Sequence, residues 1–528
     1  MTEAVEAPQP TGAAEPARRE EGPGEEGPRT LRRRVYEWRT WLVFAVIVVI
    51  GTVARVPLLH RIFSGRKAFR QAQTAWAIRE YARRGIDLLN PPLPILGPPW
   101  RLWLEFPLPQ AVGSLFVHAG LTPTVAGRLE GLLSLQVTAL LLFLLMRRLA
   151  GNRAAIIAVA LLETVPLTAW FGANASIEFF VTSLVLGSVL GLIRFLDNGR
   201  WWWWVTAAVC SALAFMVKVT TGTAWMIPLI VLVLVSARPD WRSRWRRSLL
   251  GLVAAPGAGL AGEAWWAHWS TVNNDASRFT VFQTFHADWR GVVGTVHDRL
   301  IWSKYDILIH RMGELMTGRA WLFAVAIIAI AVFARRNRAV LLSLAAVPVT
   351  GAFVWFPLYV QHDYYPCAVV PAAVAVMAVG IDATATAVAT RWRDGLRWAG
   401  RWTATVLSVA GVLLLLGLSW TSGFGHQVRA DLRAHPKMPW ESVVMRTYTP
   451  KDAKIIMIGC SWDSRYLYNA DRWGLMYIKA TFGPLSADYV SSTYQYVMVC
   501  GGPRQLGALP QSLTYEPVAT GLYRIQTP

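Results

Sequence analysis

Basic side chains gather just beyond the first long apolar run of this chain. Arg66, Lys67 and Arg70 lie within a single helical turn of sequence, and apolar residues recur at helical spacing from Phe69 onward. A cation cluster at the start of a helix is suited to bind a phosphate group. The same cations would also bind lipid headgroups, so a phosphate-bearing substrate and the membrane surface remain alternatives. We expect this helix to lie along the membrane interface.

Two carboxylates stand in apolar surroundings. Glu105 lies in the segment WLEFP, and Glu178 opens an apolar run directly after Asn174 and Ser176. A carboxylate in apolar surroundings requires a charged partner or indicates a catalytic or binding role. The alternative for Glu105 is an ion pair with Arg101 or with a cation of the preceding helix. For Glu178 the alternative is a first-turn carboxylate in a helix that Asn174 or Ser176 caps.

Cations and hydrogen-bond donors also occur at the ends of later apolar runs. Lys218 separates two such runs, where an isolated lysine is costly unless it reaches water or meets an anion. His362, Tyr364 and Tyr365 open another run and offer donors to a phosphate or a sugar. An aromatic belt at the membrane surface would account for the tyrosines but not for the adjacent His-Asp pair. We therefore predict that Lys218, His362, Tyr364 and Tyr365 bind a phosphate group together with Arg70.

Membrane-spanning helices are the elements that must position these residues. About eleven apolar stretches have spanning length, at 41–59, 124–146, 154–172, 175–196, 201–217, 221–236, 248–268, 320–334, 339–358, 364–388 and 402–421. If the N-terminus is inside, nearly every short arginine-rich connector falls on the same side, as the positive-inside rule requires. The candidate site residues then lie at the outer ends of the spans.

Composition agrees with a membrane protein. Of the 528 residues, 54% are hydrophobic and only 16% are charged, whereas a soluble domain carries roughly 25% charged residues. The net charge of +20 resides largely in connectors between apolar runs, which argues against a nucleic-acid-binding face. The four cysteines have no metal-ligand spacing. A divalent cation remains possible, because no carboxylate cluster dictates or excludes one.

The chain divides into three predicted parts. Residues 1–28 are rich in Pro, Glu, Gly and Ala and are expected to form a disordered cytoplasmic tail without a cleavable signal peptide. Residues 29–421 form the transmembrane domain, with large outer loops at 60–123 and 269–319. Residues 422–528 form a small extracytoplasmic α/β domain, with strands expected at 454–459, 494–500 and 521–526.

Two cysteines fall within this last domain. Cys460 and Cys500 each stand at the end of a predicted strand. An oxidising environment outside the cytoplasm would permit a disulfide between them, although two buried thiols remain the alternative.

These residues resemble the GT-C superfamily of integral-membrane glycosyltransferases. The likeness is to the branch with protein O-mannosyltransferases, aminoarabinose transferases and galacturonic-acid transferases. It is carried by FRQAQTA at 69–75, WLEFP at 103–107, HDYY at 362–365 and the C-terminal segments IGCSW, YLY and RWG. These motifs follow in order over most of residues 40–525. The resemblance implies a GT-C-like helical membrane protein of bacterial envelope type.

The first-loop motif departs from the family at one position. The resemblance implies an aspartate there, which takes the proton of the acceptor, but this chain has Gln73. An amide cannot accept that proton at neutral pH. Either Glu105 or Glu178 supplies the missing carboxylate, or the protein is catalytically altered.

The function that the resemblance implies is transfer of a sugar from a polyprenyl-phosphate donor. The acceptor would be a cell-envelope glycan, lipid or protein on the outer face of the membrane. The reaction would be an inverting displacement in which a carboxylate takes the acceptor proton and Arg70, Lys218 and His362 stabilise the departing phosphate. The alternatives are a non-catalytic relative that binds lipid-linked sugar or assists envelope assembly, and a transporter.

Overall fold

The computed structural model describes residues 28–63, 68–237, 241–281, 285–316, 319–334, 337–393 and 402–526. It divides the chain into two compact units, Met1–Val43 and Phe44–Pro528. The second unit contains every described residue that bears on function.

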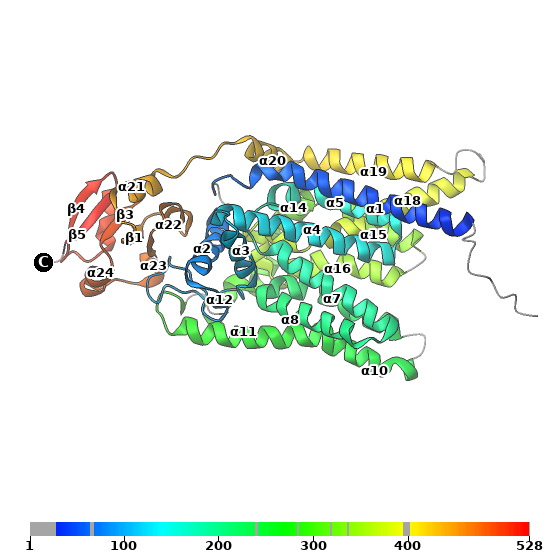
Figure 1. The fold of residues 1–528 in the computed structure, drawn as a ribbon, viewed down its shortest axis with the longest axis horizontal. Coiled ribbons are helices and arrows are strands. Elements are labelled where there is room, and N and C mark those ends of the chain that lie inside the picture. Colours follow the sequence, from blue (N-terminus) through cyan, green and yellow to red (C-terminus); the bar gives the residue numbers. More distant parts are fainter. Residues whose placement is uncertain are drawn as a thin grey trace, which may run out of the picture. The chain divides into compact units, whose positions relative to one another are not determined.

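Long apolar helices dominate the described residues (Figure 1). Six of them are long and apolar enough to cross a membrane: α1 (Pro28–Arg55, extended by a short 3-10 turn to Leu58), α4 (Pro123–Leu149), α7 (Glu178–Asn198), α8 (Trp201–Ala224), α18 (Val370–Arg393) and α19 (Thr403–Trp420). Three shorter apolar helices accompany them, namely α9 (Met226–Ala237), α15 (Ala320–Phe333) and α16 (Arg338–Val354). These helices confirm a multi-pass α-helical membrane protein.

The helices also show where the predicted spans are interrupted. Pro166 separates α5 (Asn152–Thr164) from α6 (Pro166–Phe171), because proline cannot donate the hydrogen bond that would continue the helix. Pro256 lies in a π-helical turn between α10 (Trp241–Leu252) and α11 (Ala258–Asp275). All eleven predicted stretches overlap helices, but the number of spans remains a prediction.

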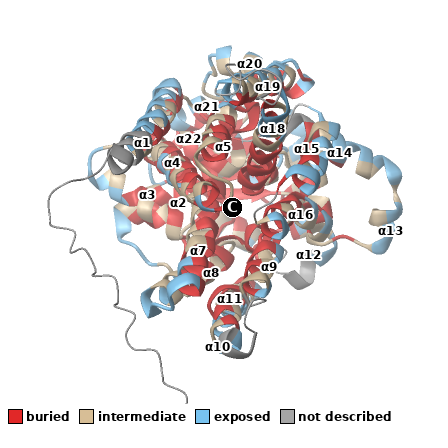
Figure 2. Ribbon diagram, turned by 90° about the vertical axis from the view of Figure 1, so that its right-hand side faces the viewer, coloured by how far each residue is buried: buried red, intermediate tan, exposed pale blue. Residues whose placement is uncertain are grey.

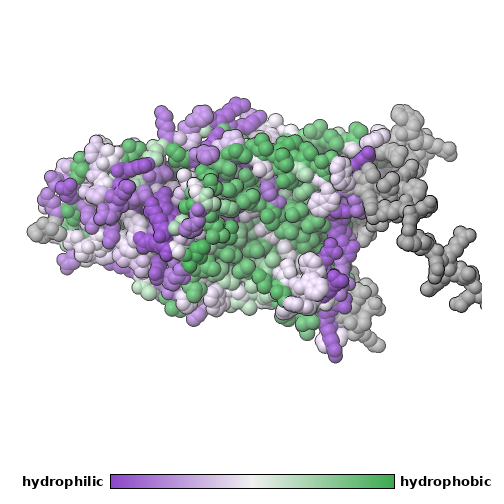
Figure 3. Space-filling view, in the orientation of Figure 1, coloured by the Kyte–Doolittle hydropathy of each residue, from purple (hydrophilic) through white to green (hydrophobic). Residues whose placement is uncertain are grey.

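The long helices have buried inward faces and an exposed, largely hydrophobic outer surface. In Figure 2, buried residues line the inward faces of the described helices and exposed residues occupy the outward faces. On the face drawn in Figure 3, a band of hydrophobic residues covers the long helices, and hydrophilic residues cover the C-terminal domain beside that band. An apolar outer surface of this extent is suited to contact lipid.

The C-terminal residues form a five-stranded mixed sheet. Its strands are β1 (Lys454–Ile458), β2 (Trp473–Tyr477), β3 (Tyr496–Val499), β4 (Thr514–Ala519) and β5 (Leu522–Gln526), arranged in the order β2-β1-β3-β5-β4. The first three strands are parallel, and β5 runs antiparallel to β3 and β4. The three predicted strands are confirmed as β1, β3 and β5. The other two were missed, because β2 contains a glycine and β4 is largely exposed, so neither shows a strong apolar pattern.

The first outer loop is built against this sheet. Its residues 94–97 lie beside the free edge of β2, with a bridge between Leu96 and Leu475. The loop also contains α2 (Ala68–Arg84) and α3 (Leu108–His118).

The apolar face of α2 is buried within the protein. Trp76 and Ile78 have no exposed surface, and the Trp76 ring packs edge-on against Tyr468 of the C-terminal domain. The helix predicted from Phe69 is therefore present, but its apolar residues contact protein rather than lipid. The sequence pattern could not distinguish the two, since both surroundings select the same apolar stripe.

Candidate active site

A cavity of about 790 Å³ opens where the ends of several helices meet the loop 60–123, which is predicted to lie outside. Its wall contains polar and charged residues from α2, the loop before α3, the C-terminal part of α8, α11 and the segment before α18. Seven of the eight predicted site residues line it: Arg70, Gln73, Glu105, Lys218, His362, Tyr364 and Tyr365. Segments separated by almost 300 residues of sequence thus converge on one concave surface.

Arg70 stands at the centre of one polar cluster. It lies in the first turn of α2, and its Nη1 donates to Gln73 Oε1 over 3.0 Å, one turn along the same helix. Its Nη2 forms an ion pair with Oε1 of Glu105. Glu105 Oε2 has no hydrogen-bond partner among the described residues, although Glu105 is part of the cavity wall. The guanidinium therefore holds Gln73 and Glu105 side by side.

Glu105 is positioned by the loop that carries it. The backbone N–H of Phe106 donates to the carbonyl of Met216 in α8 over 3.0 Å, and Pro107 precedes the first turn of α3. The side chains of Phe106 and Trp266 also pack edge-to-face at 5.1 Å. These contacts fix the loop between α8 and α11, so that Glu105 faces Arg70.

Lys218 and Glu178 form a buried ion pair. Lys218 Nζ lies 2.6 Å from Glu178 Oε1, and the two side chains are only 4% and 2% exposed. Lys218 occupies a kink in α8, where its extended backbone (φ −160°, ψ 93°) interrupts the helix. Glu178 does not line the cavity but lies behind Lys218. Of the two candidate carboxylates, Glu105 therefore lines the cavity and Glu178 does not.

The aromatic residues before α18 cover the same lysine. Lys218 Nζ lies 4.4 Å from the ring centroid of Tyr365 and 5.1 Å from that of Tyr364. His362 packs against both rings, at 5.8 Å from Tyr365 and 5.3 Å from Tyr364. His362, Tyr364 and Tyr365 thus line the cavity together with Lys218. The ion pair and the ring faces together stabilise the charge of this buried lysine.

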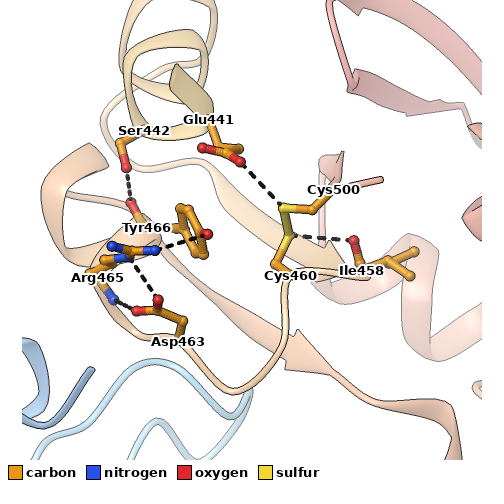
Figure 4. Close-up of a disulfide and its surroundings, with 8 residues drawn as sticks. All are labelled: Glu441, Ser442, Ile458, Cys460, Asp463, Arg465, Tyr466 and Cys500. Carbon is orange, nitrogen blue, oxygen red and sulfur yellow. Dashed lines mark hydrogen bonds and ion pairs between the residues drawn. A yellow bond between two sulfur atoms is a disulfide. The ribbon is translucent and has the colours of Figure 1, made fainter. Parts of the chain in front are cut away.

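The C-terminal domain contributes one edge of the cavity. Trp462 lies in its wall, and Ser464 Oγ donates to the carbonyl of Phe69 over 2.6 Å. Both residues follow Cys460, which forms a disulfide with Cys500 (Figure 4). Asp463 lies between these two residues and forms an ion pair of 2.7 Å with Arg465. The disulfide expected as one alternative is thus present, and it holds the base of the loop that reaches α2.

The cavity wall also contains α11, which the sequence interpretation did not single out. Glu263, Trp266 and His268 all line it. Trp266 Nε1 donates to the carbonyl of Leu104 over 2.9 Å and so supports the Glu105 loop. Glu263 has no ion-pair partner among the described residues. The signal was available, because a lone glutamate inside the predicted span 248–268 is as costly as the lysine at 218.

The structure also bears on the predicted N-cap of α7 and on the predicted cluster of cations before α2. Ile177 is the N-cap residue of α7 and makes no side-chain cap, so neither Asn174 nor Ser176 caps this helix. Asn174 Oδ1 instead accepts from Arg128 Nη1 over 3.3 Å. Arg66 and Lys67, the other members of the predicted phosphate cluster, lie outside the described residues.

The described residues contain few side chains that could together bind a metal ion. Across the described part of the chain, no group of three or more His, Cys, Asp and Glu side chains is arranged to hold a metal ion. We therefore derive no step through a metal ion.

Comparison with known proteins gives the fold its context. The sequence model of the dolichyl-phosphate-mannose-protein mannosyltransferase family matches residues 107–258, a minority of the chain. No curated protein matches by sequence. The crystal structure of ArnT from Cupriavidus metallidurans bound to undecaprenyl phosphate superposes with a TM-score of 0.57 at 15% identity, covering 92% of this chain and 97% of ArnT.

A second relative is more distant. The archaeal oligosaccharyltransferase AglB from Archaeoglobus fulgidus, in complex with an inhibitory peptide and a dolichol-phosphate, superposes with a TM-score of 0.52 at 12% identity. The match covers 88% of this chain and 69% of AglB. At identities this low, the two superpositions establish the fold alone. The chain is a multi-pass membrane protein with the fold that ArnT and AglB share.

Proposed function

We propose that this protein is a membrane glycosyltransferase that takes a sugar from a polyprenyl-phosphate donor. The observation that carries the proposal is the joint lining of one cavity by Arg70, Lys218, His362 and the carboxylate Glu105. The solved relatives of the same fold bind undecaprenyl phosphate and a dolichol-phosphate, which supports a lipid phosphate as the ligand. The acceptor would be a cell-envelope glycan, lipid or protein outside the cytoplasm.

The reaction is an inverting displacement at the anomeric carbon. The acceptor hydroxyl oxygen forms a bond to this carbon while the bond between the carbon and the phosphate oxygen breaks. The acceptor proton passes to a carboxylate, and the polyprenyl phosphate leaves with its additional negative charge. Arg70, Lys218 and His362 stabilise that charge, because fixed donors in a partly desolvated wall act more strongly than water does.

Glu105 is our candidate for the general base. Its Oε2 is without a described partner, whereas Glu178 is buried behind Lys218. Gln73 then contributes a neutral contact to Arg70 in place of the expected aspartate. Glu178 acts as a positioning residue that keeps Lys218 charged. Glu263 is the rival base, since it lines the cavity and has no described ion-pair partner.

Sugar transfer by membranes containing Glu105→Gln, Glu178→Gln and Glu263→Gln variants tests these roles. We expect Glu105→Gln to lose about 10²–10⁴-fold in kcat, the usual contribution of a general base. Glu516→Gln is the matched control, because Glu516 is exposed on β4, outside the cavity, and its side chain accepts a hydrogen bond from Gln526. Full activity of Glu105→Gln would remove Glu105 from the mechanism, and an accompanying loss in Glu263→Gln would transfer its role to Glu263.

A non-catalytic role has one observation in its favour. Gln73 stands where the resembled family has its catalytic aspartate, and both Gln73 and Glu105 are engaged by Arg70. A protein of this kind would bind polyprenyl-phosphate sugar without transferring it. Wild-type binding of such lipids, combined with no transfer from any polyprenyl-phosphate sugar tested, would select this alternative.

A further inference from the structure

A second cavity, of about 800 Å³, lies outside the site described above. It is bordered by the C-terminal half of α2, the end of α3, the start of α4, and residues 446–451 and 469–472 of the C-terminal domain. Its lining is Arg79, Ala82, Arg83, Val117, Pro123, Arg446, Thr449, Pro450, Lys451, Asn469, Ala470, Asp471 and Arg472. None of these residues lines the first cavity.

The wall of this second cavity is strongly positive. Five of its lining residues are arginine or lysine, and Asp471 is its single carboxylate. Asp471 is shared between two of the cations, at 2.7 Å from Arg79 Nη1 and 2.8 Å from Arg83 Nη2. Glu80 and Asp452 stand nearby but do not line the cavity. Glu80 lies 3.0 Å from Arg84 and 3.5 Å from Arg83, so it also offsets part of the charge of Arg83. Arg446, Lys451 and Arg472 have no ion-pair partner among the described residues. The wall therefore carries an excess of positive charge.

Arg472 supplies a buried part of that charge. Its side chain is 3% exposed, and its guanidinium makes five hydrogen bonds to carbonyl oxygens and to the Thr449 hydroxyl. All of these acceptors are uncharged. Burial lowers the pKa of Arg472, Asp471 opposes that effect, and the charge of Arg446 adds to it. A buried cation held only by neutral oxygens raises the positive potential of the surface above it.

Three donors in the wall are available to a ligand. Arg446 and Lys451 are exposed, and their side chains have no hydrogen-bond or ion-pair partner among the described residues. Asn469 Nδ2 is buried and also has no partner in the described part of the chain. A buried amide donor without a partner is costly, so a ligand oxygen in the cavity would stabilise it.

We propose that this second cavity binds a phosphate-bearing group. Arginine, lysine and amide donors converging on one hollow match the several oxygens and the charge of a phosphate. The cavity is bordered by Pro123, the first residue of the membrane-spanning helix α4, where lipid headgroups lie. A membrane lipid headgroup and a soluble phosphate ester share this chemistry. The inference does not depend on the proposed transfer reaction.

The two cavities are separate along α2. Arg70 lines the first and Arg83 the second, and thirteen residues of helix rise span about 20 Å. A phosphate bound in the second cavity would therefore not occupy the position of the phosphate in the first. This separation allows the two sites to be tested independently.

The test uses the full chain in neutral detergent and measures binding by titration calorimetry. The probes are inorganic pyrophosphate and water-soluble dihexanoyl phosphatidylglycerol, with dihexanoyl phosphatidylcholine as the zwitterionic comparison. The principal variant carries Arg446→Gln with Lys451→Gln, which removes the two unpaired cations without breaking an ion pair. Lys479→Gln with Arg504→Gln is the matched control, because both residues are exposed on the C-terminal domain outside this cavity.

We expect roughly tenfold or greater weakening of anion binding in the principal variant at low salt and none in its matched control. Tighter binding of phosphatidylglycerol than of pyrophosphate would identify a lipid headgroup, and the reverse would identify a soluble phosphate. Unchanged binding in the principal variant would overturn the proposal. So would the finding that Arg70→Gln alone abolishes all anion binding, because the first cavity would then be the phosphate site.

Discussion

At the scale of single residues, the site consists of charges that hold one another in place. Arg70 holds Gln73 and Glu105, while Lys218 is held by Glu178 and covered by two tyrosine rings. Buried charges of this kind contribute little net stability as pairs, but removing one partner is costly. We therefore expect that replacing only one residue of the buried Lys218–Glu178 pair destabilises the protein.

Glu178→Gln should destabilise the protein by about 3–5 kcal/mol, because it leaves Lys218 charged, buried and without its ion-pair partner. Glu178→Met combined with Lys218→Met should recover most of that stability, since no buried charge remains. Thermal unfolding in detergent measures both variants. A double variant no more stable than Glu178→Gln would contradict the ion-pair account.

Donor affinity separates this structural role from a functional one. If Lys218 contacts the donor phosphate, the stable double variant should still bind the donor more weakly than wild type. Donor affinity equal to that of wild type would restrict the Lys218–Glu178 pair to a structural role.

At the scale of elements, α2 packs against both the membrane domain and the C-terminal domain. Its first turn lines the first cavity, its middle packs on Tyr468, and its last turns bind Asp471 through Arg79 and Arg83. The loop after Cys460 approaches the same helix through Ser464. Both ends of α2 are therefore positioned by contacts with the C-terminal domain.

The Asp471 contacts predict a dependence of stability on pH. Burial opposes ionisation of Asp471, but hydrogen bonds from Arg83 and the charge of Arg79 outweigh it and hold the pKa below its ordinary value of 3.8. A carboxyl group whose pKa is lowered on folding stabilises the protein above its unfolded pKa, and this contribution disappears as the pH falls through the folded value. The melting temperature of the protein should thus decrease once the pH is lowered below about 4. Asp471→Asn should already be less stable at neutral pH and lose less on acidification.

The Cys460–Cys500 disulfide closes a loop with a sequence separation of 40 residues. Replacing both cysteines by serine should destabilise the C-terminal domain by about 2–4 kcal/mol, through the greater freedom of the unfolded chain. Activity should fall as well, because Trp462 lies in the cavity wall just beyond Cys460. Cys210→Ala is the control, since Cys210 is a free thiol. Thermal unfolding with and without reductant measures the effect, and identical curves would show that the loop does not need the bond.

At the scale of the whole molecule, the predicted sidedness places the C-terminal domain outside the cytoplasm. The disulfide in that domain agrees with an oxidising compartment. In a background without Cys210, a Gln511→Cys variant should react with a membrane-impermeant maleimide in intact cells. Asn198→Cys, in a predicted inner connector, should react only after lysis. The opposite pattern would reverse the predicted orientation.

Local sequence was sufficient for much of the architecture. Apolar runs predicted the helices, because every spanning segment must bury its backbone polar groups and expose apolar side chains to lipid. Arginine-rich connectors predicted the sidedness, and strands β1, β3 and β5 followed from their apolar runs. The residues suspected of chemistry were also visible locally, since an isolated charge such as Lys218 is costly in apolar surroundings.

Only the tertiary structure decided which of these charges belong together. Glu178 pairs with Lys218 across 40 residues of sequence, and Arg70 pairs with Glu105 across 35. Glu263 and the second, positively charged cavity became apparent only once distant segments were placed side by side. Composition and periodicity describe what one segment buries, whereas the partner of a buried charge depends on packing between segments. For this reason the sequence identified Arg70 and Glu105 as candidates, and the fold determined that Glu105 faces the cavity while Glu178 lies behind it.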